Sequence, residues 1–233
     1  MCVSPEASFA GGVVLSAIGV ATVSKVHKPS QILFAAIPLF FGGQQIAEGF
    51  LWLALPHAEY VGVQKVFTYI FLLMAEVIWP MLIPLAVLLM EKDKKRRRTI
   101  QMLLGFGVVL ALYYSYCLLV YSVAPQIVGF HINYNTDFPD LFALPAFVIY
   151  LIATITPLFV SSIKRTQIMG VLMFFSCLVT VIFFTQYLIS VWCFFAALLS
   201  IVVYWILHES KIAFNLERLK LLAEKIKLPT TKP

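Results

Sequence analysis

The chain of 233 residues consists of long apolar runs separated by short polar segments, and this pattern constrains its fold more than any motif does. A helix needs about 20 apolar residues to cross roughly 30 Å of hydrocarbon. The predicted spans cover residues 7–24, 31–55, 60–90, 99–122, 140–163, 167–186 and 190–208. The last two divide a charge-free run, residues 166–207, that is about twice as long as one crossing requires. The sequence therefore predicts an all-α, polytopic membrane protein built as a bundle of seven transmembrane helices.

The composition agrees with this class of protein. Hydrophobic residues make up 61% of the chain and charged residues only 12%, whereas soluble proteins carry about 25% charged residues. Too few charged side chains are present to cover a water-facing surface. The four cysteines show neither a CxxC pair nor the spacing of a zinc finger or a disulfide framework.

The basic residues orient the predicted bundle. All but one of the 17 lysines and arginines fall in residues 25–28, 92–98, 164–165 and 211–232, and the exception is Lys65. Seven alternating crossings place these four segments on the same side of the membrane. Because short loops rich in lysine and arginine face the cytoplasm, the amino terminus is predicted outside and the carboxyl terminus inside. The net charge of +6 then reflects topology and does not indicate binding to nucleic acid.

Residues 209–233 are predicted to form a cytoplasmic tail after the last span. Ile212, Leu216 and Leu219 recur at helical spacing, and the basic residues of the tail lie mostly on the other faces. A basic amphipathic helix of this kind lies along an anionic membrane surface, so membrane lipids are expected partners. The alternative is that the seventh helix continues into water.

Two glutamates lie inside predicted spans, Glu48 in the second and Glu76 in the third. An ionisable group at this depth costs at least about 2.5–3.5 kcal/mol on insertion scales, and it usually faces the interior of the bundle and has a function. The alternative is that both glutamates are neutral, hydrogen-bonded links between helices.

Further polar residues share a helical face with Glu48. Gln44, Glu48 and Trp52 repeat every four residues, and Gln45 lies beside them. This spacing places the side chains on one face of the helix. We expect that face to look into the bundle.

The third span offers a matching face. Lys65 and Glu76 are eleven residues apart, which is about three turns of an α-helix and nearly the same azimuth. Tyr69 falls near that face. With charge toward one end and apolar residues toward the other, the two faces predict a polar cavity that opens outward.

The segment between the fourth and fifth spans, residues 123–139, is predicted to be a loop on the outer side. It contains His131, and Cys2 is predicted on the same side of the membrane. A carboxylate, an imidazole and a thiolate together suit zinc or another transition metal. Glu48, His131 and Cys2 are therefore a candidate set of ligands for a divalent metal. A solvated histidine is the simpler alternative, because the spacing specifies no metal.

Two sequence motifs suggest a family. The chain opens Met1-Cys2-Val3-Ser4 and contains Gln44-Gln45-Ile46-Ala47-Glu48-Gly49 followed by Trp52. These motifs resemble an uncharacterised family of bacterial multi-pass inner-membrane proteins, whose members open Met-Cys-Phe-Ser and carry a Gln-Gln-x-x-Glu-Gly-x-x-Trp stretch. Val3 departs from the usual phenylalanine, and the Ser190-Val191-Trp192-Cys193 segment is similar as well. The resemblance implies a bacterial inner membrane and brings no activity with it.

Several activities are disfavoured. A retinal protein of this topology needs a lysine in its last span, and residues 166–207 contain none, so no retinal is expected. No HExxH, GxSxG, P-loop or GxGxxG motif stands where its structural context would support it. The sequence leaves an enzymatic role undecided and favours a non-enzymatic one.

The leading hypothesis is a cavity that binds or moves a small cation, a proton or a polar solute. The predicted lining residues are Gln44, Gln45, Trp52, Glu48, Tyr69 and Glu76. One alternative is a membrane-embedded enzyme, with or without a metal, that acts on a lipid or quinone-like substrate. Another is a membrane sensor or scaffold that uses the basic tail to contact a partner.

Overall fold

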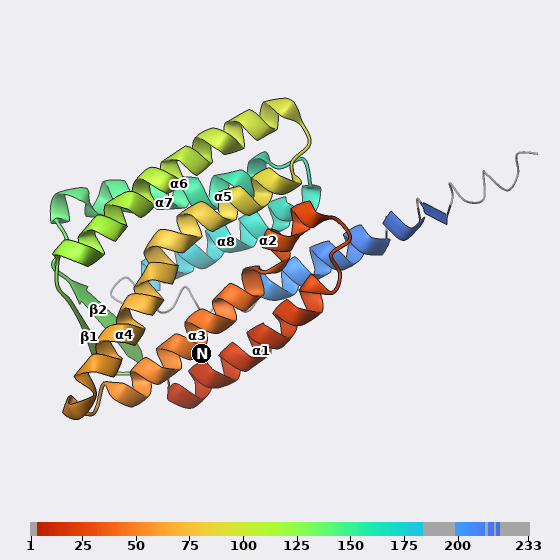
Figure 1. The fold of residues 1–233 in the computed structure, drawn as a ribbon. Coiled ribbons are helices and arrows are strands. Elements are labelled where there is room, and N and C mark those ends of the chain that lie inside the picture. The colour runs from red at the N-terminus through yellow and green to blue at the C-terminus, as the bar shows by residue number, and fades with distance from the viewer. Residues whose placement is uncertain (1–3, 184–198, 213, 217, 220–233) are drawn as a thin grey trace, which may run out of the picture.

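The computed structural model describes residues 4–183, 199–212, 214–216 and 218–219 of the chain. Within these residues the protein is mostly helical, and six helical stretches are long and apolar enough to cross a membrane (Figure 1). They are Pro5–Val23, Pro29–Ala54, Ala58–Met90, Lys94–Val120, Asp140–Val160 and Lys164–Phe183. Their lengths and compositions are those of an integral membrane protein.

Each of the six stretches overlaps one of the first six predicted spans. Parts of the sixth and seventh predicted spans fall on residues 184–198, which lie outside the described residues. Residues 199–212 form a helix that continues past residue 209, where the sequence predicts the tail to begin. Residues 220–233 of that tail are also outside the described part of the chain.

Four of the stretches are single helices: α1 (Pro5–Val23), α6 (Lys94–Val120), α7 (Asp140–Val160) and α8 (Lys164–Phe183). The second stretch consists of the 3-10 turn η1 (Pro29–Gln31), α2 (Ile32–Ala35) and α3 (Ile37–Ala54). The third consists of the 3-10 turn η2 (Ala58–Tyr60), α4 (Val61–Leu72), the π-helix η3 (Leu73–Ile78) and α5 (Trp79–Met90).

The local sequence explains where several helices begin. The Ser4 side chain accepts a hydrogen bond from the backbone N–H of Ala7, 3.2 Å away, at the start of α1. Asp93 accepts one from the N–H of Arg96, 2.8 Å away, at the start of α6. Both are N-caps that satisfy an otherwise unpaired N–H of the first turn. Pro38 lies in the first turn of α3, where its missing N–H costs nothing.

Residues 123–139 do not form the predicted loop. They contain two antiparallel strands, β1 (Val123–Val128) and β2 (His131–Thr136), so the all-α prediction is wrong for this segment. Gly129, with φ of +61°, makes the tight turn between the strands. Ile132 and Tyr134 are buried while their neighbours along β2 are more exposed, which is the alternation of a half-buried strand.

The bundle has two chemically different ends. The hairpin of β1 and β2 lies at one end, beside the end of α6 (Figure 1). At the other end the basic segments meet: Lys211 Nζ donates to the carbonyl oxygen of Ser24 at 3.0 Å, and Arg165 pairs with Glu209 at 3.2 Å. Among the described lysines and arginines, Lys65 lies toward the hairpin end, as the sequence pattern predicts. Which end faces the cytoplasm remains a prediction from the positive-inside rule.

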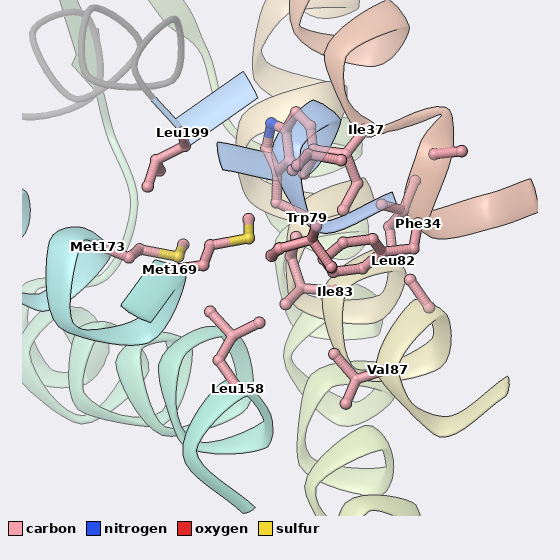
Figure 2. Packing of buried hydrophobic residues seen from close by; sticks show 14 of the residues in the cluster. Phe34, Ile37, Trp79, Leu82, Ile83, Val87, Leu158, Met169, Met173 and Leu199 are labelled. Atoms are coloured by element: carbon pink, nitrogen blue, oxygen red, sulfur yellow. The ribbon is translucent and has the colours of Figure 1, made fainter. Parts of the chain in front are cut away.

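Two apolar clusters fill the interior. The larger, toward the basic end, packs α2, α3 and α5 against α7, α8 and the helix at 199–212. Figure 2 shows it at close range, with side chains from these elements pointing toward one another. The smaller cluster, toward the hairpin end, joins Trp52 of α3 and Phe71 of α4 to Ile132 and Tyr134 of the hairpin. The Tyr134 and Phe71 rings stack with their centroids 4.9 Å apart.

Small residues let α1 and α3 approach closely. A Cβ atom added to Gly42 would lie 2.5 Å from Ser16 Oγ and 3.0 Å from the carbonyl oxygen of Gly12. Lipid supplies no hydrophobic drive for helix association, so close packing of this kind is a main source of stability between membrane helices.

Candidate functional site

The predicted polar face of α3 is directed into the protein. Gln44, Gln45, Glu48 and Trp52 are all buried, and Glu48 has no exposed surface. Gln45 Nε2 donates to Glu48 Oε2 at 3.3 Å, so this amide supports the carboxylate one turn away along the same helix. The four-residue spacing thus identified the inward face of α3 correctly.

Gln44 connects α3 to α5. Trp79 Nε1 donates to Gln44 Oε1 at 2.9 Å, and the Trp79 ring stacks on Phe41 with centroids 3.9 Å apart. Trp79 therefore belongs to this site, although the sequence analysis did not include it. Gln44 Nε2 and Trp52 Nε1 are buried donors with no hydrogen-bond partner among the described residues.

Glu76 lies on the π-helical turn η3, and Pro80 explains why this turn is irregular. The N–H of Trp79 donates to the carbonyl oxygen of Met74, five residues earlier, which is the π-helical pattern. The next carbonyl, that of Ala75, would need the N–H of Pro80, and proline has none. Tyr150 of α7 supplies the missing donor, because its hydroxyl donates to the Ala75 oxygen at 2.8 Å.

The Glu76 side chain is enclosed by the bundle, with 9% of its surface exposed. Its Oε2 atom has no hydrogen-bond partner within the part of the chain that the structure describes. Tyr113, Tyr114 and Cys117 of α6 are close enough to interact with it electrostatically. Because η3 packs against α6, Glu76 lies on a segment that neighbours these weakly acidic hydroxyl and thiol side chains.

The predicted shared face of Lys65 and Glu76 is wrong. Lys65 is exposed and Glu76 is buried, and Tyr69 is half-buried in the apolar cluster of the hairpin end. The prediction assumed a uniform α-helix with 3.6 residues per turn. The wider turn η3 changes this register between the two residues.

Gly107 allows α6 to lie directly against the helix that carries Glu76. A Cβ atom at position 107 would overlap the carbonyl oxygen of Pro80. That carbonyl has no α-helical donor of its own, since the residue four positions later is Pro84. The two prolines and this glycine together bring α6 to the Glu76 side of the bundle.

Two of the three candidate metal ligands, Glu48 and His131, lie within the described residues. Among those residues, no group of three His, Cys, Asp or Glu side chains is placed to hold a metal ion. His131 is half-buried on β2 at the hairpin end, while Glu48 is enclosed within the bundle. Cys2, the third predicted ligand, lies outside the described residues.

The hairpin covers the end toward which the predicted cavity opens. Ile132 and Tyr134 pack with Trp52 and Phe71, which leaves Trp52 only 8% exposed. This cover was not predicted from the sequence, because residues 123–139 were expected to form a loop. In this conformation Trp79 belongs to the larger apolar cluster and Trp52 to the smaller one, so the candidate site adjoins both.

A third buried glutamate, Glu91, was not singled out from the sequence. It directly follows α5, and its carboxylate accepts hydrogen bonds from the N–H groups of Lys92 and Asp93, both at 2.9 Å, and from Ser162. Ser162 donates twice, from its N–H at 2.6 Å and from its hydroxyl at 2.7 Å. Burial alone would raise the pKa of Glu91, but these hydrogen bonds outweigh burial and hold the pKa below its usual value.

This carboxylate ties the connection between α5 and α6 to the turn between α7 and α8. Arg96 strengthens the same junction, because its guanidinium donates to the carbonyl oxygens of Val160 at 2.8 Å and Ser161 at 3.0 Å. The available signal in the sequence was an acidic residue at a helix end together with a Ser-Ser turn on the same side of the membrane. Glu91 is therefore part of a structural junction at the basic end.

Comparison with known proteins gives a family and no activity. Residues 1–217 match the model of a family described as a family of unknown function (DUF6629), and the chain belongs to that family. No curated protein and no solved structure matches the chain. The match agrees with the expectation of an uncharacterised family.

Proposed function

We propose that the polar residues around Glu48 and Glu76 bind and move a small cation or proton across the membrane, and that Glu76 is the group that takes up and releases the proton. The observation that carries this proposal is the environment of Glu76. It is buried on a π-helical turn, and one of its carboxylate oxygens has no hydrogen-bond partner among the described residues. Intramembrane carboxylates in such positions mark ion and proton pathways, and π-helical turns are frequent at functional sites.

A proton suits Glu76 better than a hard metal cation. Calcium and magnesium are held by six or more oxygen ligands, and no cluster of metal-ligating side chains surrounds Glu76 in the described part of the chain. A low-dielectric interior tolerates the neutral carboxyl group far better than the ion. The nearby groups on α6 are tyrosine hydroxyls and a thiol, which can donate or accept hydrogen bonds.

Glu48 and its neighbours would connect this group to the hairpin end. Gln44 and Trp52 carry donors that no described residue accepts from, and a buried polar group of this kind commonly holds an ordered water molecule. Such waters would extend from Trp52 beneath the hairpin toward Glu76. We place the hairpin end outside, in a seven-span bundle in a bacterial inner membrane with its carboxyl terminus in the cytoplasm.

The test is proton flux into proteoliposomes that contain the purified protein, driven by a potassium diffusion potential and followed with an internal pH dye. We expect Glu76→Gln to abolish the protein-dependent flux and Glu48→Gln to reduce it. Glu59→Gln is the matched control, because Glu59 is an exposed carboxylate at the same end of the bundle. Flux that is unchanged in both Glu48→Gln and Glu76→Gln would refute the proposal.

A further inference from the structure

Tyr150 makes a hydrogen bond that replaces a bond of the α-helix. In a regular α-helix the Ala75 carbonyl would accept from the N–H of Trp79. Here the Trp79 N–H donates to Met74 instead, and the Tyr150 hydroxyl occupies the Ala75 oxygen at 2.8 Å. The side chain of α7 therefore stabilises the wide turn at the expense of the α-helical one.

The choice between the two turns decides where Glu76 points. One residue of an α-helix corresponds to a rotation of about 100°, so a change from a π turn to an α turn would rotate the residues on one side of it relative to the other. Glu76 lies inside the turn η3, next to the Ala75 carbonyl that Tyr150 holds. Tightening of the turn would move its carboxyl group relative to Tyr114 and Cys117 of α6.

The helix beyond η3 is held in place by contacts of its own. Trp79 is hydrogen-bonded to Gln44 of α3, and Pro80 lies against Gly107 of α6. A change of register would therefore affect Leu73–Ile78 and the preceding helix α4, and it would not spread into α5. Tyr150 contacts this segment from α7.

We propose that Tyr150 is a positioning residue for Glu76. Its hydroxyl holds η3 in the π form and thereby keeps the Glu76 carboxyl group inside the bundle, facing α6. This inference rests on the proposed function, because it assigns a role to Tyr150 only if Glu76 exchanges protons.

The test uses dicyclohexylcarbodiimide, an apolar reagent that adds to a protonated carboxyl group and rearranges to a stable acylurea. The labelling rate at Glu76 is measured by mass spectrometry of the full-length protein in proteoliposomes across a range of pH. We expect Tyr150→Phe to lower the rate at neutral pH by about fivefold to tenfold, the ratio that corresponds to one hydrogen bond of ordinary strength. Tyr116→Phe is the matched control, since Tyr116 is exposed on α6.

A second variant separates positioning from a general loss of packing. Pro80→Ala restores a backbone N–H, so the Ala75 carbonyl has a donor from the main chain in either form of the turn and no longer depends on Tyr150. In the Pro80→Ala background, we expect Tyr150→Phe to change the labelling rate by less than about twofold, which is the signature of two coupled sites.

The outcomes distinguish the two proposals. If the labelling rate at Glu76 is the same in the native protein and in Tyr150→Phe, the positioning role is overturned. The proposed function would still stand. If Tyr150→Phe lowers the labelling rate equally in the native and the Pro80→Ala background, the positioning role is also overturned, because the hydroxyl would then act independently of the Ala75 carbonyl. A native protein in which Glu76 is not labelled at any pH would contradict the proposed function itself.

Discussion

Glu76 and Glu91 are two buried glutamates whose carboxyl groups have opposite hydrogen-bonding environments. Glu76 lies within the third helical stretch and is 9% exposed, whereas Glu91 directly follows that stretch and is 3% exposed. The Glu91 carboxylate accepts four hydrogen bonds, from Lys92, Asp93 and Ser162. One oxygen of Glu76 accepts none from the described residues.

This difference separates Glu91, a structural carboxylate, from Glu76, the carboxyl group for which we propose a function. A buried charge that is fully hydrogen-bonded stabilises the fold, because each bond to an ionised group contributes about 1.5–3 kcal/mol. A buried carboxyl group with an unused oxygen contributes little to stability, so its retention inside a bundle requires another reason. By exposed fraction alone, Glu76 and Glu91 belong to the same class of buried glutamates. The hydrogen-bond partners are what distinguish them.

The largest expected effect comes from the packing that brings α6 to Glu76. Gly107→Ala places a methyl group on the Pro80 carbonyl oxygen, so we expect a loss of about 3 kcal/mol or more in stability. Gly105→Ala is the control, because no atom lies within 4 Å of a Cβ at that position. The measurement is thermal unfolding of both variants in detergent. Equal midpoints would show that α6 does not lie against α5 as described.

The two glutamates should differ in how much their replacement by glutamine destabilises the protein. Glu91→Gln leaves one acceptor where the carboxylate has two, and it directs an amide group at N–H donors, so we expect a loss of about 2 kcal/mol. Glu76→Gln keeps the shape of a side chain whose Oε2 has no described partner, and its stability should change by less than about 1 kcal/mol. Thermal unfolding of the two variants side by side is the measurement. A larger loss for Glu76→Gln would reverse the assignment.

The contribution of Glu91 to stability should depend on pH. Because hydrogen bonds lower the pKa of Glu91 in the folded state, its contribution is fully present above the unfolded value of 4.5 and is lost as the pH falls through the lower folded pKa. The difference in unfolding midpoint between the native protein and Glu91→Gln should therefore be constant from neutral pH down to about 5 and shrink below 4.5. A difference that grows on acidification would contradict the account.

These cases show how far the sequence could predict the structure. Apolar run length was sufficient to find the membrane-length helices, and the spacing of Gln44, Glu48 and Trp52 was sufficient to find the inward face of α3. Both depend on regular helices, in which position along the chain determines direction in space. The burial of Glu76 followed from its position inside an apolar run and not from helical spacing.

The rest depends on contacts between distant residues. The π turn arises because Pro80 lacks an N–H and Tyr150, in another helix, supplies the replacement. Glu91 stands at the start of a charged segment that looks fully solvated, and only its partner Ser162 makes it a buried junction. The hairpin was hidden because Pro125 and the polar residues of β2 weaken the usual strand pattern.

The smallest expected effect concerns access to the site from the hairpin end. Tyr134 stacks on Phe71 in the apolar cluster that also contains Trp52, and a stacked aromatic pair contributes about 0.5–1.5 kcal/mol. In a variant without native thiols, Glu48→Cys should react with a membrane-impermeant thiol reagent added outside, and Tyr134→Ala should accelerate that reaction about threefold to tenfold. Labelling only from the cytoplasmic side would overturn the proposed orientation.

We propose that Glu76 exchanges a proton with the surrounding water, whereas hydrogen bonds hold the pKa of Glu91 below its usual value and keep it ionised at neutral pH. Infrared difference spectra of the protein in lipid, recorded between acidic and alkaline pH, report protonated carboxyl groups directly through their carbonyl band. We expect a band that responds to bulk pH, disappears in Glu76→Gln and persists in Glu91→Gln. A pH-responsive carboxyl band that is unchanged in Glu76→Gln would contradict it.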